Sequence, residues 1–215
     1  QILFDGVSAS QIDRGVIRKN ISCVLQKTAV YSGTIRHNIE MGRPGAEETD
    51  ILEAADIAQL TPFLNSLPEH LEHPLQQSGK NLSGGQKQRL CIARALLRRP
   101  KILILDDSTS AVDTKTDAKI REGLASYLPN TTKLIIAQRI SSVQDADRII
   151  VMEGGRIKDI GNHDELLKTS EIYRETFTSQ NKMSAEGEEA AETVAANTEA
   201  SAPQAQTQEG GEAHE

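Results

Sequence analysis

The chain has 215 residues, of which 37% are hydrophobic, 26% charged and 3% aromatic, and its formal net charge is −7. This size allows a packed core, while the scarcity of aromatic residues and of basic blocks argues against a nucleic-acid surface. No apolar run approaches the roughly 20 residues that a membrane-spanning helix needs.

The acidic residues gather at the C-terminal end. Residues 184–215 contain eight Glu, no Lys, Arg or Asp, and a single apolar β-branched residue, Val194. Such a segment cannot bury enough apolar surface to offset the entropy lost on ordering. We therefore predict a disordered acidic tail, which we interpret as a solvated linker rather than an interaction tail. The remaining residues are close to electrically neutral.

The two cysteines, Cys23 and Cys91, lie far apart and form no Cys-x-x-Cys pair. This spacing argues against a zinc site, and a reducing cytosolic compartment fits it better than a disulfide framework does. We expect both thiols to face the core as small apolar groups.

Short strands and helices alternate along most of the chain. Apolar runs predict strands at 2–4 and 21–25, and apolar residues at helical spacing predict a helix over 47–60. The runs at 102–105 and 134–137 are separated by a helical stretch, as a parallel βαβ crossover requires. We expect 102–105 to be a central strand buried on both faces.

A hairpin is predicted at 149–160, where two strand-like runs flank Gly154 and Gly155. Asn162, with Glu165 three residues later, offers a capping box for a following helix. The fold class is therefore α/β with a mainly parallel sheet, which a largely helical insert at about 33–82 interrupts.

The strongest local motif is Leu82-Ser83-Gly84-Gly85-Gln86, which opens a long helical pattern. Ser83 is a good N-cap, and Gln86 completes a capping box. The two glycines leave backbone N–H groups open at the positive end of the helix dipole, which suits a phosphate. A capped helix with a glycine hinge is the alternative interpretation.

The second motif is a buried strand, 102–105, that ends in Asp106 and Asp107. Ligands of open α/β sheets bind at the carboxyl ends of strands, where a carboxylate commonly holds Mg²⁺. A pair of turn-forming aspartates is the alternative.

Together these motifs resemble the nucleotide-binding domain of ABC transporters of the exporter type. The resemblance covers residues 1 to about 180 and follows the family's order of motifs. The matching segments are the Q-loop at Gln26, the exporter segment Gly33–Ile39, the LSGGQ signature Leu82–Gln86, the Walker B strand Ile102–Asp106, the D-loop Ser110–Asp113 and the terminal segment Gly161–Leu167.

The resemblance implies a P-loop NTPase-like (RecA-like) core with a helical subdomain, and ATP and Mg²⁺ as cofactors. The expected segments are part of the ATPase core at 1–32, a mainly helical subdomain at 33–82, the signature helix and the rest of the core at 83–183, and the disordered tail at 184–215. The implied partners are a second ABC subunit and transmembrane domains, without nucleic acid, at the cytoplasmic face of the cell membrane.

The family also implies roles for individual residues. Two such domains dimerise head to tail, so the signature of one contacts the ATP bound to the other. The implied contacts to the partner-bound ATP are Ser83, Gly84, Gly85 and Gln86, with Asp113 in the D-loop. Asp106 would hold Mg²⁺ through water, and Gln26 would sense Mg²⁺ and the attacking water.

Three features depart from the family pattern. No GxxxxGK[ST] phosphate loop occurs, because the Gly79-Lys80 pair is followed by Asn81. We expect that loop to precede residue 1, which leaves the core incomplete at its N-terminus and the chain inactive on its own. Asp107 stands where the family has a catalytic Glu, and Gln138 stands where it has the His of the H-loop.

The loss of Glu and His beside an intact signature resembles the degenerate-site subunit of a heterodimeric exporter. In that hypothesis the chain completes the working site on its partner and does little hydrolysis at its own. Three alternatives remain at this point: a non-catalytic regulatory ATP-binding subunit, a soluble ABC ATPase that acts on DNA or the ribosome, and a truncated gene product. The transported substrate is not encoded in this segment.

Overall fold

The computed structural model describes residues 1–182, so the tail predicted at 184–215 lies outside the described residues. The chain divides into two compact units, 1–147 and the residues from 148 onward, and each is described by itself. Within residues 1–182, no helix has the length and apolar character to cross a bilayer.

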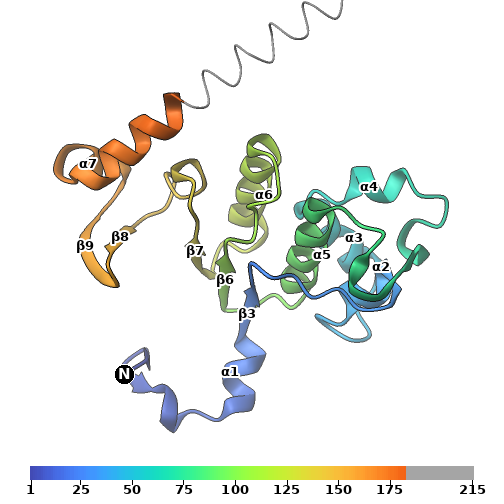
Figure 1. Ribbon diagram of the computed structural model, residues 1–215. Coiled ribbons are helices and arrows are strands. Elements are labelled where there is room, and N and C mark those ends of the chain that lie inside the picture. Colours follow the sequence, from blue (N-terminus) through green and yellow to red (C-terminus); the bar gives the residue numbers. More distant parts are fainter. Residues whose placement is uncertain (183–215) are drawn as a thin grey trace, which may run out of the picture. The chain divides into compact units, whose positions relative to one another are not determined.

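The first unit is built on a three-stranded parallel sheet (Figure 1). Its strands are β3 (Ile21–Val24), β6 (Ile102–Asp106) and β7 (Thr132–Ile136), in the order β3-β6-β7. Both pairings are parallel, and their register aligns the carboxyl ends of the three strands. The predicted α/β class with a parallel sheet and a central 102–105 strand is confirmed.

Helices α5 (Gly84–Leu97) and α6 (Thr114–Tyr127) cover one face of this sheet. Leu103 and Leu105 are buried in the core that these helices close, while Ile102 and Ile104 on the opposite face are only half-buried. The expectation of a strand buried on both faces is therefore wrong, because no element described within residues 1–147 covers the second face.

The same open face corrects the prediction for one cysteine. Cys23 lies beside Ile104 in the register of the sheet and is exposed, whereas Cys91 on α5 is buried as expected. Alternation along β3 sends the side chain of Cys23 away from the helices, while its neighbours Ser22 and Val24 are buried.

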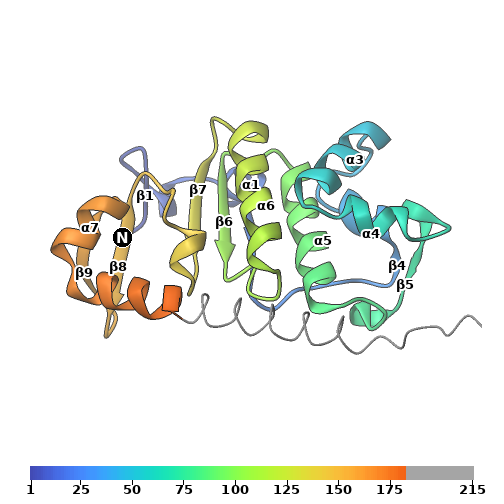
Figure 2. The ribbon, with the colours of Figure 1, turned by 90° about the horizontal axis from the view of Figure 1, so that it is seen from above.

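A mainly helical segment joins β3 to α5. It contains α2 (Ile35–Glu40), α3 (Glu48–Ile57), α4 (Thr61–Asn65), the short 3₁₀ turns η2 (His70–Glu72) and η3 (Gln77–Gly79), and a β-ladder between β4 (Gly33–Thr34) and β5 (Pro74–Leu75). Helices α2 and α3 pack on α5, on the side away from β7 (Figure 2). Whether 33–82 is a subdomain with those bounds stays a prediction.

Helix α3 forms where the spacing of apolar residues predicted a helix. Ile51, Ala54 and Ala55 are fully buried at helical spacing against α5. The helix ends at Ile57 rather than near residue 60, because Gln59 adopts a left-handed backbone with φ of 56°.

The N-terminal residues form a hairpin and a short helix. The predicted first strand is β1 (Leu3–Phe4), and it pairs antiparallel with β2 (Val7–Ser8) across the Asp5-Gly6 turn. After the 3₁₀ turn η1 (Ala9–Gln11), α1 (Arg14–Asn20) leads into β3.

The second unit begins with the predicted hairpin, β8 (Ile149–Glu153) and β9 (Arg156–Gly161). Gly154 and Gly155 both have positive φ, 56° and 74°, which a tight two-residue hairpin turn requires. Helix α7 (His163–Thr169) follows, and the predicted capping box between Asn162 and Glu165 is present.

Candidate functional site

The N-terminus of α5 has the geometry that the signature motif predicts. The Ser83 hydroxyl accepts a hydrogen bond from the Gln86 amide at 3.2 Å, and the Gln86 side chain accepts one from the Ser83 amide at 2.8 Å. Within residues 1–182, the N–H groups of Gly84 and Gly85 have no acceptor. The helix start therefore presents free donors at its positive end.

The two glycines also allow a second segment to lie close to this helix. A Cβ at Gly84 would lie 3.3 Å from the Ala111 Cβ, and a Cβ at Gly85 would lie 2.8 Å from the Ala111 carbonyl oxygen. The first contact is tight and the second is a clash with backbone. Glycine at position 85 is thus a steric requirement for the approach of the loop that contains Ala111.

Three predicted site residues meet at the carboxyl ends of the sheet strands. Oδ2 of Asp107 accepts hydrogen bonds from Nε2 of Gln26 at 3.0 Å and from Nε2 of Gln138 at 3.1 Å. Each residue follows a different strand, because the aligned ends of β3, β6 and β7 bring these segments to one edge. The half-buried Asp107 carboxylate is therefore held by two amide donors.

The backbone at Asp107 is strained. Its φ of 47° is in the left-handed region, which costs energy for any residue with a Cβ. The Asp107 amide donates to the Ile136 carbonyl at 2.8 Å, which holds this conformation against β7. The turn redirects the chain immediately after Asp106, so β6 ends there.

Asp106 is the last residue of β6 and is half-buried. Burial and the nearby Asp106 charge together raise the pKa of the Cys23 thiol. In the part of the chain described, no group of three or more His, Cys, Asp and Glu residues could hold a metal by itself. The carboxylate and amide oxygens at this edge nevertheless fit Mg²⁺, which takes one or two protein oxygens and fills its shell with phosphate and water.

Asp113 begins α6 at the end of the loop. Its carboxylate accepts a hydrogen bond from the Thr116 amide at 2.9 Å. Hydrogen bonds from the Thr116 hydroxyl and then from the Thr116 amide hold the pKa of Asp113 below its ordinary value. Burial lowers the pKa of the neighbouring Arg89 guanidinium, and the Asp113 charge opposes that shift. Asp113, which the sequence predicts to lie in the D-loop, therefore caps α6.

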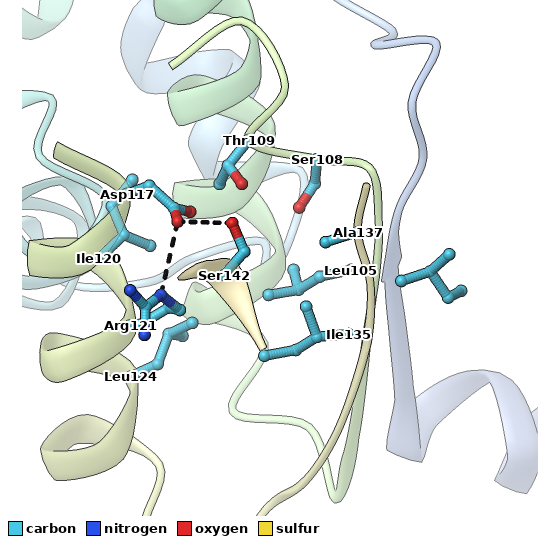
Figure 3. Close-up of a pocket in the computed structure, with 11 residues that line it drawn as sticks. Leu105, Ser108, Thr109, Asp117, Ile120, Arg121, Leu124, Ile135, Ala137 and Ser142 are labelled. Carbon is cyan, nitrogen blue, oxygen red and sulfur yellow. Dashed lines mark hydrogen bonds and ion pairs between the residues drawn. The ribbon is translucent and has the colours of Figure 1, made fainter. Parts of the chain in front are cut away.

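A small cavity lies behind the loop, between β6, β7 and α6 (Figure 3). Its volume of about 10 Å³ admits no more than a single water molecule. Beside it the fully buried Asp117 accepts hydrogen bonds from Ser142 at 2.9 Å and from Arg121 at 3.4 Å (Figure 3). The Ser142 bond ties α6 to the 3₁₀ turn η4 (Ile140–Ser142), which follows Gln138, while the Arg121 bond lies within α6. The cavity is a packing feature.

Sequence reasoning missed two residues that hold the loop. Gln88 bonds to Ser110 and Ala111, and Arg139 donates to the carbonyl oxygens of Thr109 at 2.7 Å and Val112 at 3.1 Å. A signal for Gln88 existed, because it is a polar residue on the buried stripe of α5. Arg139 carried no such signal.

A larger cavity, about 230 Å³, is lined by residues on both sides of Gln26 in the chain, though not by Gln26 itself. Leu25 and Lys27 line it from the loop after β3, Met41 lines it from the end of α2, and Arg94 and Arg98 line it from α5. Arg94 is fixed there by hydrogen bonds to backbone carbonyl oxygens and to Asn38. The cavity thus combines apolar and cationic groups from the loop after β3, the end of α2 and α5.

The predicted site residues therefore fall into two groups. One group is Gln26, Asp107 and Gln138 at the sheet edge, and the other is the signature segment 83–86 at the start of α5. The loop that runs from Asp107 to Asp113 connects them.

Comparison with known proteins assigns this arrangement to a family. The ABC transporter family profile matches residues 1–110, and the chain belongs to that family. Its fold is similar to that of a bacterial Atm1-family ABC exporter with ATP bound, with a TM-score of 0.80 and 34% identity over 83% of this chain and 31% of that one. The chain is an ATP-binding domain of the exporter type.

Two relatives support this assignment. YgaD of Bacillus subtilis (strain 168), an ATP-binding/permease protein whose name assigns it to multidrug export, is 41% identical over 84% of this chain and 31% of its own length. The fatty acid ABC transporter ATP-binding/permease protein of Mycobacterium tuberculosis is 43% identical over 80% of this chain and 27% of its own length. The chain spans under a third of each of these relatives.

Proposed function

We propose that this ATP-binding domain supplies its signature motif to an ATP molecule held by a partner domain, while its own hydrolytic site is degenerate. The observation that carries the proposal is the contrast between the two groups of site residues. The signature segment 83–86 has its cap, its glycines and its free amides in place. The positions of the catalytic Glu and His are filled by Asp107 and Gln138, which bond to each other.

The chemistry of these two residues supports weak hydrolysis at this chain's own site. Asp is one methylene shorter than Glu, which is roughly 1 Å of reach, and a misplacement of that size can cost about 100-fold in rate. Gln138 can donate a hydrogen bond to a phosphate oxygen but cannot carry or exchange a proton near neutral pH.

The cofactors in this proposal are ATP and Mg²⁺. The Asp106 carboxylate and the Gln26 amide oxygen would hold Mg²⁺. The Ser83 hydroxyl and the Gly84 and Gly85 amides would bind the γ-phosphate of the ATP held by the partner. Because the 215 residues contain no GxxxxGK[ST] sequence, this chain alone has no loop to cradle phosphates. We propose that it shows no ATPase activity by itself.

The partners in this proposal are a second, non-identical ABC subunit and transmembrane domains at the cytoplasmic face of the membrane. Two observations support the membrane partner. Each of the relatives described above combines ATP-binding and permease parts in its name. The cavity lined by Leu25 and Lys27, the chain neighbours of Gln26, also offers apolar and cationic groups that could seat an element of that partner.

The test is Ser83→Ala in the complete transporter with its partner subunit. Loss of the Ser83 hydroxyl removes both the helix cap and a donor to the partner's ATP, so we expect steady-state ATPase activity to fall at least about tenfold. Asn162→Ala is the matched control, because it removes an equivalent capping box from α7. Equal ATPase rates in Ser83→Ala and the wild type would refute the signature role.

A further inference from the structure

We propose that Gln88 is a positioning residue that locks the loop 107–113 onto the N-terminus of the signature helix α5. The proposal deepens the proposed function, because it joins the residue at this chain's own catalytic position to the motif presented to the partner's ATP. The proposal is based on the contacts of the buried side-chain amide of Gln88.

Gln88 is 4% exposed, and both polar atoms of its side chain bond to the loop. Its Nε2 donates to the Ser110 hydroxyl oxygen at 3.0 Å, and its Oε1 accepts from the Ala111 amide at 2.9 Å. This pairing is bidentate, so it fixes both the distance and the orientation of the loop relative to the helix. A buried amide that lost these partners would leave several polar groups unsatisfied.

The hydrogen-bonded chain continues to Asp107. The Ser110 hydroxyl, which accepts from Gln88, donates in turn to the Asp107 carbonyl oxygen at 2.9 Å. Gln88 is therefore linked through one side chain to the strained residue whose carboxylate binds Gln26 and Gln138. Successive bonds of this kind polarise one another and reinforce the chain.

Two further contacts hold the loop 107–113: its packing against the start of α5, and hydrogen bonds from Arg139. Ala111 packs against Gly84 and Gly85, so a movement of the loop would move the surface on which the signature rests. Arg139, directly after Gln138, donates hydrogen bonds to the carbonyl oxygens of Thr109 and Val112. The segment 109–112 is thus clamped between the signature helix and the end of β7.

This geometry predicts that the two groups of site residues respond together. A shift at Asp107 would reach Ser110 and then Gln88, which lies one helical turn beyond Gly84 on α5. Without the amide of Gln88, the loop and the signature would be free to move separately. Partner-bound ATP would then meet a signature whose position fluctuates, and the loss would fall on kcat more than on KM.

The experiment compares Gln88→Leu, Ser110→Ala and Leu96→Ala in the full protein by hydrogen exchange. Leu96 is fully buried on the same helix, away from the loop. Its variant therefore controls for a general destabilisation of α5. We expect the Ala111 amide to exchange about tenfold faster in Gln88→Leu, as the loss of one buried hydrogen bond predicts. Leu96→Ala should not change exchange at 107–113 relative to the rest of its unit.

Two further measurements separate positioning from general stability. In the assembled transporter, Gln88→Leu should lower kcat about tenfold with KM for ATP within about twofold, and Gln88→Glu, which keeps the acceptor for Ala111, should recover part of the loss. Ser110→Ala removes the bonds from Gln88 to Ser110 and from Ser110 to Asp107 but leaves the bond from the Ala111 amide to Gln88. Because it does not disturb the core of α5, it remains informative if Gln88→Leu does not fold. The effects of the two substitutions should be less than multiplicative, because both remove the bond between Gln88 and Ser110.

The proposal is overturned if exchange at 107–113 is no faster in Gln88→Leu and Ser110→Ala than in Leu96→Ala, or if the effects of the two substitutions multiply. Its failure is distinct from failure of the proposed function. An unchanged ATPase rate in Ser83→Ala would remove the signature role, while the exchange result would still report on the clamp.

Discussion

At the N-terminus of α5 the polar side chains bond within three residues, from Ser83 to Gln86 and back. At the carboxyl ends of the sheet strands, Asp107 instead bonds to Gln26 and Gln138, which lie 81 and 31 residues away in the sequence. The first site is complete wherever the helix forms. The second exists only when three strands have aligned, and it is the one that departs from the family pattern.

This difference has a functional consequence. The bonds of the cap at the start of α5 form within the helix itself, so the cap does not depend on the side chains at the strand ends, although the loop 107–113 packs against this helix start. In the proposed function, the site assembled from three segments has lost its chemistry because one side chain is shorter, even though its hydrogen bonds remain satisfied. The predictions below challenge that contrast, in order of decreasing effect.

The largest expected effect is a gain of activity at the strand ends. Asp107→Glu together with Gln138→His should raise hydrolysis at this chain's own site about 100-fold in the complete transporter, because the base regains roughly 1 Å of reach. Single-turnover hydrolysis measures this when the partner's site is inactivated. A wild-type site that already turns over as fast as the double variant would contradict the degeneracy hypothesis.

The next effect concerns the packing of the signature helix. Gly85→Ala should destabilise the first unit by about 1–3 kcal/mol, because its Cβ would clash with the Ala111 carbonyl oxygen at 2.8 Å. Gly84→Ala is the control, since its Cβ would meet only the Ala111 Cβ at 3.3 Å and the change also gains helix propensity. Urea unfolding measures both, and equal stabilities would show that the loop moves freely away from the helix.

A smaller effect compares the two capping boxes. Ser83→Ala on α5 and Asn162→Ala on α7 should each lower the free energy of unfolding of their unit by about 1 kcal/mol, as removal of an N-cap does. Only Ser83→Ala should also reduce ATPase activity. The contrast between the two helix starts is lost if both variants reduce activity in proportion to their loss of stability.

The smallest effect is the pH dependence of the cap on α6. The bond from Thr116 lowers the pKa of Asp113 in the folded state, so its stabilising contribution is present above the unfolded pKa of about 3.9 and is lost as pH falls through the folded value. Asp113→Asn keeps an N-cap but cannot titrate. We expect its melting temperature to fall less steeply than that of the wild type below about pH 4; identical acid limbs would contradict this assignment.

Much of the fold could be predicted because the decisive signals are local. The β8–β9 hairpin follows from two adjacent glycines, and the starts of α5 and α7 follow from capping boxes that span four residues each. The parallel pairing of β6 with β7 followed from two apolar runs at crossover spacing. For the hairpin and the two helix starts, the residues that determine the geometry are close neighbours in the chain.

The errors arose where burial depends on what covers an element. An apolar run such as 102–105 is compatible with a strand that is covered on one face or on both faces of the sheet. The sequence therefore did not predict the half-exposure of Ile104 or the exposure of Cys23. The end of α3 was misplaced for a similar reason, because the left-handed turn at Gln59 belongs to a site where Arg89 donates to its carbonyl oxygen at 2.7 Å.

The sequence by itself determined the α/β class, the signature helix with its cap, the paired aspartates after β6 and the family to which these motifs point. Only the tertiary structure decided that Gln26 and Gln138 share one oxygen of Asp107, and that Gln88 ties the loop between Asp107 and Asp113 to the signature helix. The physical reason is the sequence distance over which each kind of interaction acts. Caps, turns and alternation act over a few residues, whereas these bonds form between groups that only the aligned strands and packed helices bring within 3.1 Å of one another.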